Sequence, residues 1–339
     1  MQNGSRDLAS RTTLRLGGPA GHLSIAAVTD EIPQMVRGAR ASFVLAGGSN
    51  VVVSDDGYPG TVVLLRTRGC TAATEDGGIR LRVAAGEPWD DVVARTVGEG
   101  WSGIECLSGI PGSAGATPIQ NVGAYGQEVA ETIETVRVYD RHRDLDLILR
   151  PADCGFGYRT SVFKHSDRWI VLEVVLRLAI TGWSAPIRYP ELARTLGVAV
   201  GDRAPLDEVR AAVLKLRAGK GMVLDANDPD TYSVGSFFTN PVLPAADFAA
   251  LRAAGAPAWP NPDGTVKTSA AWLIEQAGFR KGYGRDGVAI STKHTLALTN
   301  RGTGTTAALL DLAREIRAGV ASRFGVTLVP EPVLVNCAL

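Results

Sequence analysis

Three polar side chains stand among neighbours that favour a chemical role. Arg159 lies among glycines and aromatic residues, where a buried guanidinium is costly without an anion and where its planar fork suits a carboxylate. Ser236 lies between Gly235 and two phenylalanines, a poor place for a serine that only aids solubility. Glu331 lies between two prolines in an apolar tail. Taken singly, Arg159 fits a structural ion pair or a surface position equally well, and Glu331 fits a turn residue better.

The segment Ser108–Gly126 combines five glycines with almost no charge and few bulky side chains. Glycines let backbone N–H groups approach a ligand closely and form an anion-binding concavity, so this composition favours a diphosphate site. The alternative is a flexible surface loop, although such loops are usually richer in charge. A shorter glycine turn, Ala46–Asn50, follows an expected strand and repeats the pattern. Two such turns in adjacent parts of the chain indicate one extended ligand between them.

Two common nucleotide motifs are missing. No G-x-G-x-x-G joins a strand to a helix, and Lys220 is followed by glycine and methionine rather than by serine or threonine. Neither a Rossmann fingerprint nor a Walker phosphate loop is therefore predicted.

The elements that must position these residues are short apolar runs and amphipathic helices. Strands are expected at 43–46, 51–53, 61–65, 79–84, 135–139, 170–178, 295–299 and within the tail 326–335. Helices are expected at 32–39, 87–97, 206–216, 270–277 and 306–324. In the first helix, Ile32, Met35, Val36 and Ala39 share a face, and Thr29 or Asp30 is the expected cap. Ser269 and Gly278 are expected to bound the fourth helix, and Gly325 is expected to end the last.

Length and composition predict a globular, cytoplasmic protein of two or three domains. The chain has 339 residues, 45% apolar and 21% charged. Basic and acidic residues both number 35, so nothing calls for nucleic acid as a partner. The polar start Met1–Gly18 is not a secretory signal, and no apolar run approaches the roughly 20 residues that span a bilayer, so no membrane partner is expected.

The four cysteines and four histidines are dispersed, without the close spacing of metal ligands. No metal site is therefore predicted. The cysteines are interpreted as reduced thiols buried as small apolar groups.

Taken together, motifs along nearly the whole chain resemble one family, the UDP-N-acetylenolpyruvoylglucosamine reductases. In order, they occupy 12–20, 46–50, 111–126, 157–159, 235–241, 271–278 and 330–332. Pro118–Gly126 and Gly235–Phe238 are the specific signals among them. Tyr189 falls where one branch of the family carries a substrate-covering loop, so the chain resembles that longer form.

The resemblance implies an α/β (α+β) fold with a two-part FAD-binding region of the vanillyl-alcohol-oxidase type and a separate substrate domain. Residues 1–68 and 69–218 would hold FAD, the second part being joined by 328–339. Residues 219–327 would bind the substrate.

The resemblance also implies an FAD-dependent reaction of peptidoglycan precursor synthesis, and with it a role in cell-wall biogenesis, cell shape and division. NADPH would reduce the bound flavin and leave. UDP-N-acetylglucosamine enolpyruvate would take its place, and hydride transfer to its vinyl carbon would give UDP-N-acetylmuramate. The enzyme is expected to be a monomer.

Each site residue receives a role from this resemblance. Arg159 and a protonated Glu331 would stabilise the aci-carboxylate formed by hydride addition, and Ser236 would protonate its carbanion-like carbon. The flavin contacts would be Gly47, Gly48, Ser49, Asn50, Gly112, Ser113, Ala116, Ile119, Gln120 and Gly123. The substrate contacts would be Tyr158, Tyr189, Lys220, Asn240 and His294. For Lys220, a solvated surface lysine is the alternative to a diphosphate contact.

Two other functions are alternatives. One is a sugar or 2-hydroxy-acid oxidoreductase of the wider FAD superfamily, in which Gly235–Phe238 would have no purpose. The other is a flavin-binding regulatory protein without catalysis, which would have no need of Arg159, Ser236 and Glu331 together.

Overall fold

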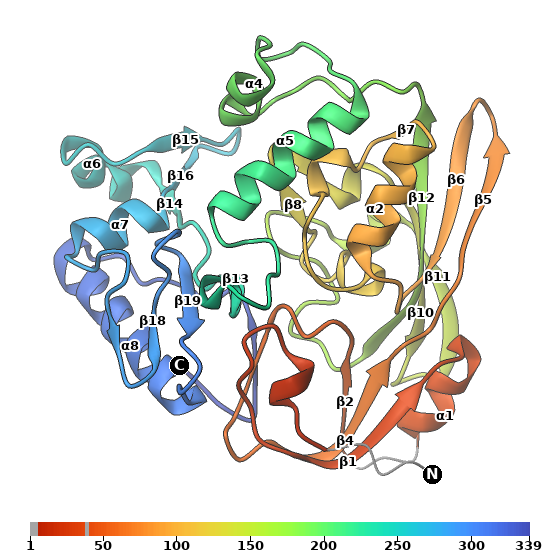
Figure 1. Ribbon diagram of the computed structural model, residues 1–339, viewed down its shortest axis with the longest axis horizontal. Helices are drawn as coiled ribbons and strands as arrows, with labels where there is room; N and C mark the ends of the chain where they lie inside the picture. The colour runs from red at the N-terminus through yellow and green to blue at the C-terminus, as the bar shows by residue number, and fades with distance from the viewer. Residues whose placement is uncertain (1–5, 38–40) are drawn as a thin grey trace. The chain divides into compact units, whose positions relative to one another are not determined.

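A computed structural model describes residues 6–37 and 41–339 of the chain (Figure 1). The chain divides into two compact units. The first comprises Met1–Arg6, Ala20–Gly48 and Pro59–Val223, and the second comprises Asp7–Pro19, Ser49–Tyr58 and Leu224–Leu339. Ala39, expected on the face of the first helix, and the first five residues of the polar start lie outside the described residues.

The main sheet of the first unit is antiparallel, with strand order β11-β10-β12-β6-β5 and with β7 paired to β12 (Figure 1). Its strands are β5 (Cys70–Glu75), β6 (Gly78–Ala84), β7 (Trp101–Ser102), β10 (Ile133–Asp140), β11 (Leu145–Leu149) and β12 (Trp169–Ile180). A smaller sheet has the order β1-β4-β2, from β1 (Ala20–Ala26), β2 (Ser42–Leu45) and β4 (Tyr58–Leu65). The valines and leucines of β6 and β12 form much of a large buried core, because alternate side chains of these strands point into it.

The helices of the first unit are α1 (Ile32–Arg37), α2 (Trp89–Gly98), α3 (Pro151–Cys154), α4 (Pro190–Leu196) and α5 (Leu206–Gly219). Helix α5 contacts both α2 and α4. Leu192 of α4 and Val209 and Val213 of α5 are buried together in a small core of their own. This packing brings the start of α4 toward the end of α5. It thereby positions Tyr189, which precedes α4, and Lys220, which follows α5.

The second unit is built on an antiparallel sheet of order β13-β19-β18-β17. Its strands are β13 (Ser233–Ser236), β17 (Gly284–Arg285), β18 (Val288–Ile290) and β19 (Ala297–Asn300). Helix α8 (Thr306–Phe324) packs against β18, β19 and α7 (Ala270–Gln276). The bounds expected for α8 are confirmed, since Gly325 ends it at a φ of 68°. Its predicted inward face, Leu309, Leu312, Ile316 and Val320, is buried.

Further elements complete the second unit. A three-stranded sheet has the order β14-β16-β15, from β14 (Val242–Pro244), β15 (Ala258–Pro260) and β16 (Thr265–Thr268), with α6 (Ala245–Ala253) packed against it. The C-terminal strand β20 (Val333–Val335) pairs in parallel with β3 (Val51–Val53).

Most expected elements occur within a few residues of their predicted bounds, and the mixture confirms the α/β (α+β) class. Two details were wrong. Thr29 and Asp30 lie inside a 3₁₀ turn, Thr29–Glu31, that leads directly into α1, so neither precedes the helical turn as a cap. Helix α7 begins after Ser269 as expected, whose hydroxyl accepts from the Trp272 N–H, but it ends at Gln276, one residue early.

The C-terminal tail and two early segments belong to the second unit. The tail 328–339 is expected to join 69–218, and its strand β20 pairs with β3. Two early segments, Asp7–Pro19 and Ser49–Tyr58, belong to the same unit as the C-terminal half. The division into two FAD-binding parts and a substrate domain stays a prediction.

The four cysteines are unpaired thiols. Cys106 and Cys154 are buried as expected, whereas Cys70 and Cys337 are only half-buried. Among residues 6–37 and 41–339, no helix combines the length and apolarity needed to cross a bilayer.

Candidate active site

The glycine-rich segment Ser108–Gly126 is built into the first unit. The backbone N–H of Ala114 donates to the carbonyl of Glu87 and that of Gly115 to the carbonyl of Ala85, both at 2.9 Å. Ala114 and Gly115 are buried. The alternative of a flexible surface loop is therefore wrong for this stretch, because it is hydrogen-bonded to its neighbours.

The two glycine turns meet within the first unit. A Cβ placed on Gly47 would lie 2.6 Å from the Cα of Gly112, so bare backbones are in contact there. Gly48 and Gly112 have φ of 63° and 122°, a region that favours glycine. Ser113 is 5% exposed, and its Oγ has no hydrogen-bond partner among the described residues. A buried hydroxyl without a partner calls for an explanation, and a ligand on the two turns provides one.

The other expected flavin residues lie along the same two turns. Ala116, Ile119 and Gln120 are half-buried on the glycine-rich segment. Ser49 and Asn50 lie just beyond Gly48, where the chain passes from the first unit to the second. The carbonyl of Asn50 accepts from the Val333 N–H at 3.0 Å, which ties this turn to β20.

Arg159 is held against the glycine-rich segment. Its Nη2 donates to the carbonyl of Gly123 at 2.7 Å, and its own carbonyl accepts from Lys164 Nζ at 3.0 Å. Its Cζ lies 5.4 Å from the centre of the Tyr158 ring. The residue has a φ of 53°, which is unusual for a side chain with a Cβ and persists only where the surroundings impose it. Such strain is concentrated at functional sites, so it supports a role for Arg159.

Ser236 ends β13 immediately after a bulge. Ser233 pairs with Thr299 and Ser236 with Ala297, with an irregularity between the two pairs. Gly235 has a φ of 74°, and its N–H donates to the hydroxyl of Ser233 at 3.1 Å. A bulge redirects the side chains that follow it, which explains physically why a glycine precedes Ser236.

Glu331 is joined to the same strand. Its N–H donates to the carbonyl of Phe237 at 2.9 Å, and Pro330 forms a bridge with Phe238. Both phenylalanines are at most 1% exposed and anchor this pairing in the core. The turn alternative for Glu331 does not describe this paired backbone. The structure thus brings Ser236 and Glu331 together in the second unit, whereas Arg159 belongs to the first.

Tyr189 and Lys220 also come together, in the first unit. Tyr189 directly precedes α4 and packs edge-on against Tyr125, with ring centres 5.4 Å apart. Lys220, at the end of α5, places Nζ 5.7 Å from the Tyr125 ring centre and 2.7 Å from Glu191 Oε2. Lys220 is therefore not a freely solvated surface lysine.

Two residues of this cluster were missed by sequence reasoning. Tyr125 has a φ of 49°, and burial raises its pKa to about 12. The Arg217 guanidinium is buried, which lowers its pKa, and its Nε has no hydrogen-bond partner among the described residues. A buried cation with an unused N–H indicates an anionic ligand. Tyr125 belongs to the specific motif Pro118–Gly126 and could have been singled out, whereas the burial of Arg217 depends on how α5 packs.

Asn240 and His294 lie in the second unit. The side-chain oxygen of Asn240 accepts from the Ala270 N–H at 3.0 Å, at the first turn of α7. His294 Nδ1 accepts from the Leu296 N–H at 3.2 Å. The carbonyl of Leu296 in turn accepts from the N–H of Phe237 at 2.7 Å, so the turn that carries His294 is bonded directly beside Ser236.

Two family profiles match this chain. Residues 228–335 match the profile described as UDP-N-acetylenolpyruvoylglucosamine reductase, C-terminal domain. Residues 24–142 match the one described as FAD binding domain.

Similar full-length proteins carry the same name. A UDP-N-acetylenolpyruvoylglucosamine reductase of Salinispora arenicola is 62% identical, with an alignment that covers 98% of this chain and 95% of that protein. Its counterpart in Thermobifida fusca is 56% identical, and the alignment covers 98% of this chain and 97% of that protein. The crystal structure of UDP-N-acetylenolpyruvylglucosamine reductase from Thermus caldophilus matches with a TM-score of 0.67 at 26% identity, over 97% of both chains.

Proposed function

The chain belongs to the UDP-N-acetylenolpyruvoylglucosamine reductase family, and on that premise we propose that it reduces UDP-N-acetylglucosamine enolpyruvate to UDP-N-acetylmuramate. NADPH is the reductant, FAD is the bound cofactor, and the reaction belongs to peptidoglycan precursor synthesis. One observation carries the proposal beyond the family name. Ser236 and Glu331 are brought together across Phe237, within the residues that match the family's C-terminal domain.

The residues of the two glycine turns fit FAD. The backbone contact of Gly47 with Gly112 leaves no side chain between the turns, and the buried hydroxyl of Ser113 offers a hydrogen bond to a ligand there. When bound, FAD supplies the redox chemistry, accepting hydride from NADPH and passing it to the vinyl carbon of the substrate. The half-buried Ala116, Ile119 and Gln120 would line the FAD site.

Arg159 and Glu331 act on the carboxylate of the substrate. Hydride addition to the vinyl carbon places negative charge on the adjacent carbon, and this charge spreads onto the carboxylate. The guanidinium of Arg159 stabilises the charge electrostatically, and Glu331, in its protonated form, donates a hydrogen bond to it.

Ser236 then supplies the proton. Its O–H donates to the carbanion-like carbon, which completes addition of one hydride and one proton across the double bond and leaves the lactyl ether. An ordinary hydroxyl is a weak acid, but the intermediate is strongly basic and the serine is held in place by the bulge at Gly235. A positioned proton donor of this kind contributes roughly 10²–10⁴-fold in rate.

The cluster around Lys220 receives the UDP part. Tyr189 and Tyr125 offer aromatic surface for the uracil, and Lys220 and the unused Nε of Arg217 offer positive charge to the diphosphate. Lys220 would exchange Glu191 for a phosphate oxygen. Tyr158, beside Arg159, would flank the substrate and the nicotinamide.

Asn240 and His294 complete the substrate contacts. The side-chain oxygen of Asn240 holds α7, so its amide nitrogen would contact the substrate. The enzyme acts as a cytoplasmic monomer in this proposal.

The test is stopped-flow absorbance of the bound flavin. We expect the purified protein to be yellow, NADPH to bleach it, and the enolpyruvyl sugar nucleotide to restore the colour. In Ser236→Ala, bleaching should persist while reoxidation slows by about 10²–10⁴-fold. Thr239→Val, which removes a hydroxyl that donates to Val329, is the matched control and should keep both steps.

The two parts of the proposal can fail separately. If the wild-type flavin is bleached but not reoxidised by the sugar nucleotide, the substrate is assigned incorrectly. If Ser236→Ala is reoxidised at nearly the wild-type rate, Ser236 is not the acid.

A further inference from the structure

The buried carboxylate of Asp230, in the second unit, holds the turn beside Ser236. We infer that Asp230 is a positioning residue of the protonation step, because it fixes the turn Ser291–Leu296 that sets where Ser236 and Glu331 lie. This inference rests on the proposed function and adds to it a residue that touches neither substrate nor cofactor.

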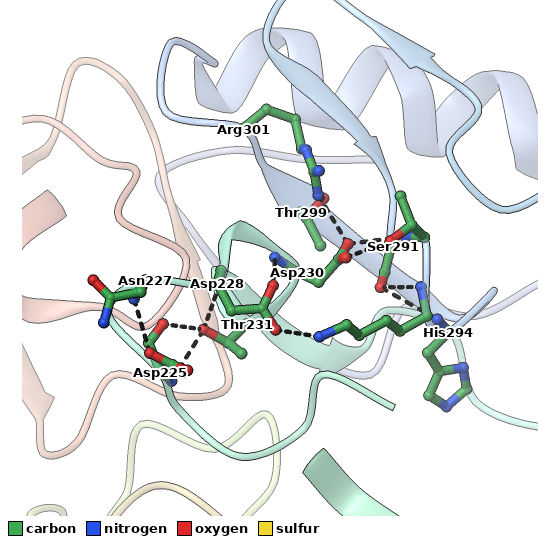
Figure 2. A network of polar contacts seen from close by, with 11 residues as sticks. Asp225, Asn227, Asp228, Asp230, Thr231, Ser291, His294, Thr299 and Arg301 are labelled. Atoms are coloured by element: carbon green, nitrogen blue, oxygen red, sulfur yellow. Dashed lines mark hydrogen bonds and ion pairs between the residues drawn. The ribbon is translucent and has the colours of Figure 1, made fainter. Parts of the chain in front are cut away.

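Hydrogen-bond donors surround the carboxylate of Asp230. Asp230 is only 4% exposed to solvent. Oδ1 accepts from the Thr292 N–H at 2.9 Å and from Arg301 Nη1 at 2.8 Å, and Oδ2 accepts from the Thr292 hydroxyl at 2.5 Å. Figure 2 shows this carboxylate in the middle of the network, with the guanidinium of Arg301 reaching it. Both oxygens are used to hold other residues.

The negative charge of Asp230 strengthens these contacts. Burial by itself would raise the pKa of Asp230, but hydrogen bonds from Thr292, Ser291 and Arg301 outweigh it, and the pKa lies below its ordinary value. The carboxylate is therefore ionised at neutral pH. Hydrogen bonds to a charged group are roughly twice as strong as neutral ones, so this group holds its partners firmly.

A second aspartate supports the same turn. The Asp230 N–H donates to Asp228 Oδ1 at 3.0 Å, and Lys293 Nζ lies 2.5 Å from Asp228 Oδ2. Thr292 and Lys293 are consecutive residues, so two carboxylates hold the start of the turn. Within the turn, the hydroxyl of Ser291 accepts from the N–H groups of Lys293 and His294. The imidazole of His294 points away from the network in Figure 2.

The end of the turn is paired with the strand that carries Ser236. The carbonyl of Leu296, where the turn ends, accepts from the N–H of Phe237 at 2.7 Å, and the next residue, Ala297, pairs with Ser236. The carbonyl of Phe237 accepts from the N–H of Glu331 at 2.9 Å. Phe237 is therefore hydrogen-bonded both to the turn and to Glu331, and it directly follows Ser236. The position of the turn thus affects the positions of both Ser236 and Glu331.

The strand itself cannot fix this position alone. Strand β13 has four residues, lies at the edge of its sheet and contains the bulge at Gly235. A bulge interrupts the ladder, so few strand hydrogen bonds hold Ser236. A misplacement of about 1 Å can cost about 10²-fold in rate, which makes the anchoring turn matter for catalysis.

The experiment uses the holoenzyme of Asp230→Asn and measures the two half-reactions separately. We expect flavin reoxidation at saturating sugar nucleotide to slow by about 10- to 100-fold. We expect flavin reduction by NADPH to stay within about twofold of wild type, because Asp230 and its turn belong to the second unit whereas Gly47, Gly48 and Gly112 belong to the first.

A double variant distinguishes positioning from mere support. If Asp230 acts through Ser236, Asp230→Asn should add almost nothing to the slowing already caused by Ser236→Ala, because residues that act as a unit are not additive. Asp140→Asn is the matched control, since Asp140 is also a buried carboxylate paired with an arginine, Arg168, but in the first unit. It should lower thermal stability without changing the ratio of the two half-reaction rates.

Three results would overturn the inference. One is a reoxidation rate in Asp230→Asn equal to wild type. Another is equal slowing of both half-reactions. The third is a double variant in which reoxidation slows by the product of the factors measured for the two single variants. If Asp230→Asn does not fold, Thr292→Val removes a single hydroxyl donor to the same carboxylate and should slow reoxidation by several-fold with reduction unchanged. Wild-type reoxidation, measured in parallel, reports separately on the proposed function.

Discussion

At the scale of single residues, the proposed chemistry rests on Ser236 and Glu331, which are far apart in the sequence and are brought close by backbone pairing across Phe237. The carbonyl of Phe237 accepts from the N–H of Glu331, and both flanking phenylalanines are buried. Glu331 looked like a turn residue because its two prolines disrupt regular structure. The prolines instead flank a short segment whose backbone pairs with Phe237 and Phe238, directly after Ser236.

Glu331 gives a prediction at this scale. If it acts by donating a hydrogen bond, Glu331→Gln keeps a donor and should slow flavin reoxidation by the sugar nucleotide less than Glu331→Ala does. Loss of one such donor costs roughly 10²–10³-fold in rate, so the alanine variant should approach that range. The measurement is the stopped-flow reoxidation rate, with NADPH reduction as the internal control. Equal slowing in both variants would count against a protonated Glu331.

At the scale of elements, three glycines are explained by what the backbone must do. Gly47 and Gly112 bring two turns into direct contact, and Gly235 takes the left-handed conformation that forms the bulge before Ser236. In each case a side chain or an ordinary φ would displace a residue to which a role in cofactor binding or proton transfer is proposed.

Gly47→Ala gives a prediction at this scale. The new Cβ would lie 2.6 Å from the Gly112 Cα, so the two turns must separate. We expect the protein to fold but to be purified with much less flavin, measured as the ratio of absorbance at the flavin band to that of the protein. Overpacking of this kind costs typically about 1–3 kcal/mol, or about a 5- to 150-fold weakening if it falls on binding.

Gly98→Ala is the matched control for that variant. Gly98 is the exposed last residue of α2, and a Cβ there meets nothing within 4 Å. Alanine is the better helix former by up to about 1 kcal/mol, so flavin content should not fall. Full flavin content in Gly47→Ala would show that this contact does not shape the cofactor site.

Elements with a clear period were predictable, and those without one were not. Helix α8 was predicted with its true bounds because its buried positions recur at helical spacing between Thr305 and Gly325. Strand β5 was missed, because almost all of its side chains are exposed and its sequence shows no apolar alternation. Its conformation comes from pairing with β6, which no local pattern reports.

At the scale of the whole molecule, stability should depend on pH through Asp140. Its pKa is held at about 2, chiefly by the hydrogen bond from Arg168 and against the effect of burial. In the unfolded chain an aspartate has a pKa of about 3.9. A group with a lowered folded pKa stabilises the protein above the unfolded value and loses that contribution as the pH falls through the folded value.

The expected outcome is a difference between wild type and Asp140→Asn that depends on pH. The midpoint of thermal unfolding, followed by intrinsic fluorescence, should be higher for wild type at neutral pH. The gap should shrink between about pH 4 and about pH 2, where the wild-type carboxyl becomes protonated and resembles the amide. A gap that stays constant down to about pH 2 would show that Asp140 contributes packing alone.

The sequence by itself determined the family, the α/β class, the long periodic elements and the candidate residues of the site. It could do so because these depend on local composition, on helical and strand periods, and on motifs such as Pro118–Gly126 and Gly235–Phe238. The buried face of a helix and a glycine with a positive φ can both be recognised from residues that lie close together in the sequence.

Only the tertiary structure decided which of these residues meet. It paired Glu331 with the strand of Ser236, tied the tail to β3, gathered Tyr125 and Tyr189 beside Lys220, and buried Arg217 and Asp230. Asp230 lies in a polar stretch that reads as an ordinary loop, and its importance depends on Thr292 and Arg301, more than 60 residues away. Burial and long-range hydrogen bonding depend on the packing of distant segments, and no local pattern in the sequence reports that packing.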